Sequence, residues 1–140
     1  MKRLFRALRD DRGVAAVEFA LIVPILASLI VLGIDGWTRI NQVSQMRSAV
    51  QTGARYYQAG GADDNAAAQL ALASWNNAPA GATVTTARSC TCGGAGASCS
   101  SLCANQALPQ AYVTLTATGG FSDMMTGQQS LTQSGTVRVR

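Results

Sequence analysis

The sequence contains no histidine and few charged residues, and these absences exclude several classes of function. Only 13% of its 140 residues are charged, 6% are aromatic and three are proline. Beyond residue 34 the only acids are four aspartates, and no phosphate-binding loop is present. The chain therefore offers little with which to build acid–base or nucleophilic catalysis. We expect a non-enzymatic protein that holds neither a metal nor a cofactor.

The apolar residues, which make up 48% of the chain, concentrate between Val14 and Ile34. This run of 21 residues carries a single charge, Glu18. At about 1.5 Å per residue, a helix of this length crosses a hydrocarbon layer about 30 Å thick. A signal-peptide core is usually shorter, and a buried core helix would need a larger surrounding domain than the remaining residues can form. The sequence predicts one transmembrane helix over residues 14–36.

The distribution of cations predicts the orientation of this helix. Residues 1–13 form a basic leader with five cations and two acids, whereas residues 14–140 have a net charge of only +1. Cations directly before a span mark its cytoplasmic side. The N-terminus should therefore lie in the cytoplasm and the C-terminal part in the periplasm of a bacterium. Because the remaining charge is small and forms no basic patch, we expect no binding to nucleic acid.

Four cysteines lie close together in a glycine-rich loop, residues 90–103. They are Cys90, Cys92, Cys99 and Cys103. In an oxidising compartment these cysteines should form disulfides, and their spacing fits no common zinc site. A bond between Cys90 and Cys92 is disfavoured because residues two apart rarely meet disulfide geometry. The nested and the crossed pairings both remain open.

Beyond the apolar run, residues 37–60 predict an amphipathic continuation of the same helix, which ends at Gly60 and Gly61. Apolar residues recur there at steps of three or four, as expected for packing under a sheet. They are Trp37, Ile40, Val43, Met46, Val50, Ala54 and Tyr57. Trp37 also suits an anchor at the membrane interface.

Residues 61–140 predict a small α+β domain. A short helix should begin near Asp63, Asp64 or Asn65, place Ala68, Leu72 and Trp75 on one face, and end by Pro79 and Gly81. Alternating side chains predict strands over residues 112–118 and 136–140, with 82–88 as a weaker third and a turn at Gly119–Gly120. We expect an antiparallel sheet of three or four strands that packs on the amphipathic half of the long helix.

The residues Arg12-Gly-Val-Ala-Ala-Val-Glu-Phe19, which follow the basic leader and open the apolar run, resemble the processing site of type IV pilin-like proteins. The resemblance implies that a prepilin peptidase cuts between Gly13 and Val14. It places Glu18 at the fifth position of the mature chain and Phe19 at a position that is often aromatic. The longer stretch from Arg12 to Pro24 is similar to the start of TadE-like proteins of tight-adherence (Tad) pilus systems. The closing residues 131–140 are loosely similar to the end of those proteins.

This resemblance implies a pilin-like fold and a minor pilin or pseudopilin that acts in pilus biogenesis and adhesion. Its partners would be the prepilin peptidase, other pilin subunits, the assembly platform and, before assembly, the lipid bilayer. Its location would be the inner membrane, or the cell exterior once it is part of a pilus. The new amine of Val14 and the carboxylate of Glu18 would pair, because an unpaired charge in an apolar core costs several kcal/mol. The alternative is an uncut, signal-anchored periplasmic binding module stapled by disulfides.

Overall fold

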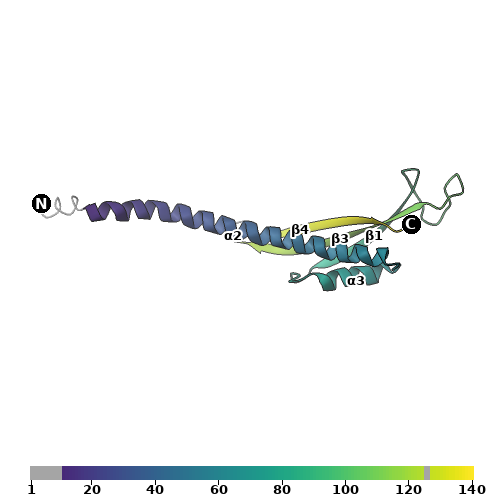
Figure 1. Ribbon diagram of the computed structural model, residues 1–140, viewed down its shortest axis with the longest axis horizontal. Helices are drawn as coiled ribbons and strands as arrows, with labels where there is room; N and C mark the ends of the chain where they lie inside the picture. Colours follow the sequence, from purple (N-terminus) through teal and green to yellow (C-terminus); the bar gives the residue numbers. More distant parts are fainter. Residues whose placement is uncertain (1–10, 125–126) are drawn as a thin grey trace, which may run out of the picture. The chain divides into compact units, whose positions relative to one another are not determined.

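The computed structural model describes residues 11–124 and 127–140, with side chains from residue 15 onward, and has an α+β fold (Figure 1). The chain divides into two compact units after Thr38. Its elements are the helices α2 (Asp11–Gln58) and α3 (Asp64–Ser74) and the strands β1 (Thr83–Cys92), β2 (Ala95–Ala97), β3 (Gln110–Asp123) and β4 (Gly127–Arg138). The expected long N-terminal helix and small antiparallel sheet are confirmed. Most of the leader lies outside the described residues.

The helix α2 ends where the sequence predicts, because two glycines close it. The backbone N–H of Gly60 donates to the carbonyl of Tyr57, and the N–H of Gly61 donates to that of Tyr56, each at 3.0 Å. These two bonds form a Schellman motif, which requires a left-handed residue just after the helix. Gly60 has a φ of 94° and supplies that conformation without a side-chain clash.

The helix α3 begins at a side-chain cap but buries a different face from the one predicted. The carboxylate of Asp63 accepts hydrogen bonds from the backbone N–H groups of Asn65 and Ala66, at 2.8 and 3.2 Å. The buried residues are Ala67, Ala71 and Trp75, whereas the predicted Leu72 is exposed and Ala68 is half-buried. The prediction is therefore confirmed for Trp75 and wrong by one position for the other two residues.

The reason for this shift is the close approach of α3 to Gly53 of α2. A Cβ atom added to Gly53 would lie 3.1 Å from the Cβ of Ala71 and 3.2 Å from the carbonyl oxygen of Ala67, and it would collide with Leu115. Only small side chains fit between two helices that pack this tightly. Alanines therefore occupy the contact, and the larger leucine points to solvent.

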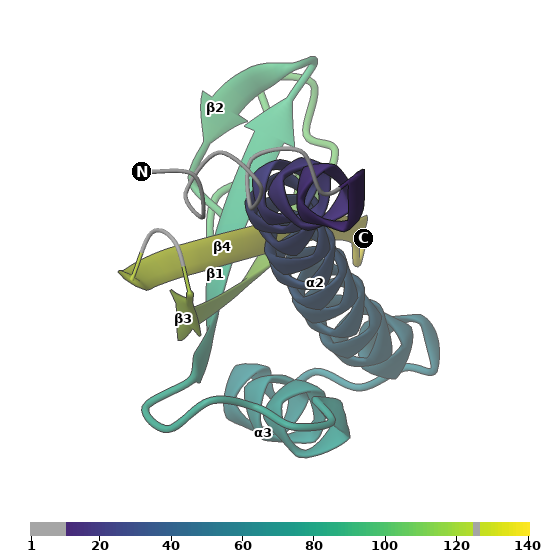
Figure 2. The same cartoon turned by 90° about the vertical axis from the view of Figure 1, so that its left-hand side faces the viewer.

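The sheet has four antiparallel strands in the order β2-β1-β3-β4 (Figure 2). Each predicted strand is present and is longer than the sequence pattern indicated. The predicted turn at Gly119–Gly120 is wrong, because these residues pair with Leu131 and Ser130 inside the ladder between β3 and β4. Gly119 instead makes room for a large neighbour: an added Cβ would lie 3.0 Å from the ring of Trp75 and 2.9 Å from Pro79.

The core lies between one face of this sheet and the two helices. Alternate residues of β3 face the helices and are fully buried. The buried cluster joins Val113, Leu115 and Ala117 of β3 with α2 from Met46 to Tyr57, and with Trp75 after α3. The predicted apolar stripe packs under the sheet only over this stretch. At its start the prediction was wrong, because Trp37 and Ile40 are each 69% exposed.

Candidate functional site

The first half of α2 exposes an apolar surface along its described length. Large side chains from Val17 to Ile34 are exposed by between 39% and 68%. The stretch Ala15–Gln58 contains an apolar window with a mean hydropathy of 2.5, and none of that window is buried against the rest of the chain. An exposed apolar surface of this extent marks a membrane-spanning segment or a protein interface. The helix is thus consistent with single-pass membrane anchoring.

Two hydroxyl side chains of α2 donate hydrogen bonds to backbone carbonyls of the same helix. The Oγ of Ser28 donates to the carbonyl of Pro24 at 2.7 Å, and the Oγ1 of Thr38 donates to the carbonyl of Asp35 at 2.9 Å. Such local bonds suit a hydrocarbon environment, where an unpaired polar group costs several kcal/mol. Pro24 stays inside the continuous helix.

The predicted processing and assembly residues lie in the N-terminal part of the described α2. The description of this helix starts at Asp11, and the peptide bond between Gly13 and Val14 lies within it. Glu18 is exposed and follows Val14 by four residues, which places both residues on one face of the helix. Phe19 is 68% exposed and shares the apolar surface. The backbone therefore brings together the two positions that the predicted charge pair requires.

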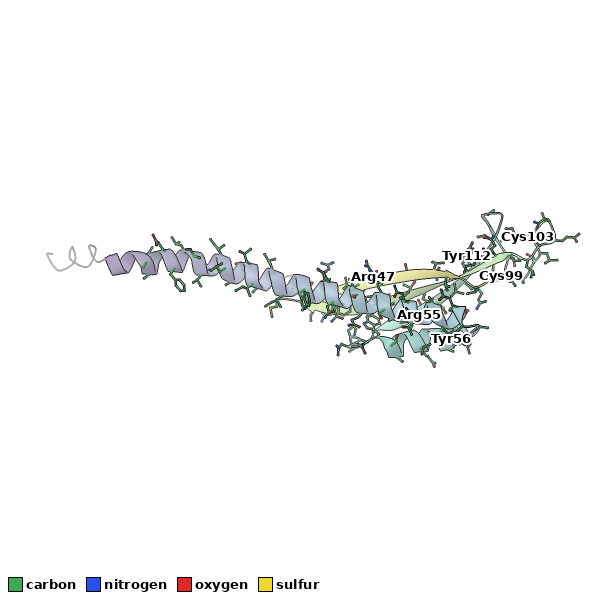
Figure 3. All side chains as sticks on the ribbon, viewed as in Figure 1. Arg47, Arg55, Tyr56, Cys99, Cys103 and Tyr112 are labelled. Atoms are coloured by element: carbon green, nitrogen blue, oxygen red, sulfur yellow. A yellow bond between two sulfur atoms is a disulfide. The ribbon has the colours of Figure 1, made fainter. Side chains whose placement is uncertain are left out.

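Two crossed disulfides staple the hairpin formed by β1 and β2. They join Cys90 to Cys99 and Cys92 to Cys103, with Cα separations of 5.1 and 5.6 Å. Cys99 and Cys103, which are labelled in Figure 3, follow β2, and each is bound to a cysteine of β1. The sequence left the crossed and the nested pairings open because β2 could not be predicted from glycine and alanine alone.

A polar cluster that the sequence pattern did not reveal joins three elements of the domain. Asp64, at the start of α3, accepts hydrogen bonds at 2.7 Å from the hydroxyl of Tyr57 and from the guanidinium of Arg88 on β1. The bonds from Arg88 and Tyr57 lower the pKa of Asp64 below its ordinary value of 3.8. Burial and the bond to Asp64 raise the pKa of Tyr57. The cluster fixes the end of α2 against the sheet.

Replacing Asp64 with asparagine should lower the free energy of unfolding by about 1 kcal/mol at pH 7. This value is that of a charged hydrogen bond, reduced because both side chains of the ion pair are 38% exposed. Because the folded-state pKa is depressed, the stabilisation is present above about pH 4 and disappears as the pH falls through the folded-state pKa. Urea unfolding of the wild type and of Asp64→Asn at pH 7 and pH 3 measures the difference in their free energies of unfolding. An equal difference at both pH values would show that the charge of Asp64 does not stabilise the fold.

The cysteines and acids of the described chain are arranged for structure. Across residues 11–124 and 127–140, no three histidine, cysteine, aspartate or glutamate residues gather as a metal site would require. Both cysteine pairs are oxidised, and Asp64 is held by an arginine and a tyrosine. The two prominent features of the described chain are the exposed apolar part of α2 and a domain that is cross-linked by two disulfides.

These features define a class of protein in which one exposed apolar helix continues into the core of a small stapled α+β domain. The family model described as TadE-like protein matches residues 13–55, from Gly13 into the packed part of α2. The resemblance expected from sequence is thereby confirmed for this segment. Neither a curated protein nor a solved structure matches the chain.

Proposed function

We propose that the protein is a minor pilin or pseudopilin of a Tad-type pilus. It is made as a single-pass precursor in the bacterial inner membrane, cut after Gly13 by a prepilin peptidase, and assembled through α2. The observation that carries this proposal is the apolar first half of α2, which lies within the TadE-like match, is largely exposed from Ala15 onward and contains Glu18. Such a surface needs lipid before assembly and sister helices afterwards.

The charge distribution and the disulfides support one orientation of this precursor. The leader has a net charge of +3 directly before the apolar run, which favours a cytoplasmic N-terminus. The two disulfides lie on the other side of the run in sequence, and disulfides persist in oxidising compartments. Both features favour a periplasmic domain, which would reach the cell exterior within a pilus.

Cleavage requires that α2 opens around Gly13. A peptidase needs access to the backbone, and the bond after Gly13 is helical in the intact chain. Glycine lowers the cost of this opening, because it destabilises a helix by about 0.5–1 kcal/mol relative to alanine. Gly13 therefore serves both as a residue without a side chain at the cut and as a weak point in the helix.

Cleavage also creates the charge that sets the register of assembly. The new amine of Val14 is mostly protonated at neutral pH, because an α-amine has a pKa of about 7.7–8.0. When helices leave the bilayer and pack together, this cation and the carboxylate of Glu18 enter an apolar core. Pairing within or between subunits then becomes the favoured arrangement. A slip by one turn, about 5.4 Å, would separate the pair.

Replacing Gly13 with alanine should block maturation. In cells that contain the cognate peptidase, the wild-type chain should lose 13 residues, which intact-mass measurement detects. The G13A chain should keep its full mass. Gly33→Ala is the matched control, because it adds the same methyl group to α2 at a position with no atom of the chain within 4 Å. It should be cut like the wild type.

Normal cleavage of Gly13→Ala would contradict the assigned processing site. A wild-type chain that keeps its full mass beside an active peptidase would favour the uncut, signal-anchored binding module instead. A cut at any other bond would show that the helix is processed in a different register.

A further inference from the structure

The face of the sheet turned away from the helices carries rows of hydroxyl groups. Alternation along β3 buries Val113, Leu115 and Ala117 against the helices and leaves the threonines between them on the opposite face. The strand registers align these threonines with residues of β1 and β4. Two complete rows are Thr83–Thr118–Thr132 and Thr85–Thr116–Ser134.

A third row continues the pattern toward the stapled hairpin. It consists of Ala87, Thr114 and Thr136, and the hydroxyls of Thr114 and Thr136 lie 2.9 Å apart. The fourth row ends the surface with the ring of Tyr112 between Ser89 and Arg138 (Figure 3). Alternate residues on a strand lie about 6.7 Å apart and neighbouring strands about 4.8 Å apart, so the hydroxyls form a regular grid.

None of the nine positions in the first three rows carries a charge. Their side chains are exposed on β1 and β4 and half-buried on β3, so the grid is open to solvent. Edge strands often carry lysine or other charges, which oppose association with another strand, but the grid positions of the edge strand β4 are uncharged. Arg88 of β1 does not belong to this face, because it turns toward Asp64 on the helix side.

The chemistry of this surface selects among partners. Nucleic acids and anionic lipid surfaces require clusters of cations, which the three rows lack. The core of a protein interface is rich in aromatic residues, methionine and arginine, whereas serine and threonine are rare among its energetically important residues. A grid of neutral donors and acceptors matches a ligand that is itself neutral and covered with hydroxyl groups.

We propose that the outer face of β1, β3 and β4 binds a neutral polysaccharide. The hydroxyls of the three rows exchange hydrogen bonds with successive sugar residues, and the ring of Tyr112 stacks on a sugar at the hairpin end. Its hydroxyl donates to Gln110 at 2.9 Å, which fixes the position of the ring. The inference rests on the proposed pilin function, because a glycan-binding face on this subunit would let the pilus adhere to a surface that carries the glycan.

The test is retention of the purified full chain, in detergent, on insoluble cellulose and chitin and in gels that contain neutral xylan. The wild type should be retained on at least one of these neutral polymers and not in gels that contain alginate, which is acidic. Thr116→Lys places a charge at the centre of the grid and should weaken binding at least about tenfold, as should Tyr112→Ala. Gln51→Lys adds the same charge on exposed α2 and should bind within about twofold of wild type.

Ser134→Lys on the edge strand repeats the test if Thr116→Lys unfolds, which circular dichroism detects. Three results would overturn the proposal: no retention of the wild type on any neutral polymer, retention of both lysine variants of the grid at the wild-type level, or stronger retention of the wild type in alginate than on the neutral polymers. Self-association that the grid variants abolish, without glycan binding, would assign the face to a second copy instead. Cleavage plays no part in this test, so the processing proposal and the glycan proposal can fail separately.

Discussion

Replacing Glu18 with alanine should leave cleavage after Gly13 intact and reduce incorporation into filaments at least about tenfold. The carboxylate lies one helical turn beyond Val14, on the same exposed face of α2. Removing it leaves the mature amine without its partner in the apolar core of the assembly. Breaking a buried ion pair in this way costs about 3–5 kcal/mol, which is more than a hundredfold in an equilibrium constant.

Immunoblots of sheared filaments and of the membrane fraction measure how much of each variant is incorporated into filaments and how much stays in the membrane. Glu18→Asp keeps the charge on a side chain shorter by one methylene group, and it should restore much of the incorporation. Wild-type incorporation of Glu18→Ala would show that apolar packing alone sets the register. Failure of Glu18→Ala to be cut would place the residue in peptidase recognition instead.

Replacing Leu115 with alanine should destabilise the domain by about 3 kcal/mol. The side chain is fully buried at the point where β3 meets α2 and α3, and it contacts the position that glycine keeps open at residue 53. Truncation removes apolar contacts and leaves a cavity that the packed alanines of α3 cannot fill. Urea unfolding in mild detergent, followed by circular dichroism, gives the change in free energy.

Leu102→Ala is the matched control for this experiment, because Leu102 is 60% exposed beside the stapled hairpin. It should change the free energy of unfolding by less than about 0.5 kcal/mol. Equal losses for the two variants would show that the contact between helix and sheet does not dominate the stability of the domain.

The sequence predicts the long helix well because its signals are local. The apolar run, the stripe from Met46 to Tyr57 and the closing glycines are each visible within a few turns. The cap at Asp63 is local in the same way. The strand centres also follow from alternation, since Val113 and Leu115 face the core and their neighbours do not.

Features that depend on partners distant in sequence were missed or misassigned. Gly119 looked like a turn residue because the sequence does not show that Trp75 needs its space. The buried face of α3 depends on Gly53, which belongs to another helix. Tyr57 and Arg88 meet at Asp64 only after the chain has folded back over 24 residues.

The hydroxyl grid could be predicted from the sequence only in part. Alternation places Thr114, Thr116 and Thr118 on one face of β3, and this is visible in the sequence. Their alignment with Thr85 and Ser134 depends on strand register, which only the structure supplies. The spacing of the cysteines likewise left the crossed and the nested disulfide pairings open, and the structure has the crossed one.

N-terminal sequencing of the protein isolated from its native envelope tests the central claim most directly, because every step of assembly follows from one cut. The account predicts a chain that begins Val-Ala-Ala-Val-Glu, with residues 1–13 absent. A chain that still begins at Met1 in cells with an active prepilin peptidase would contradict it.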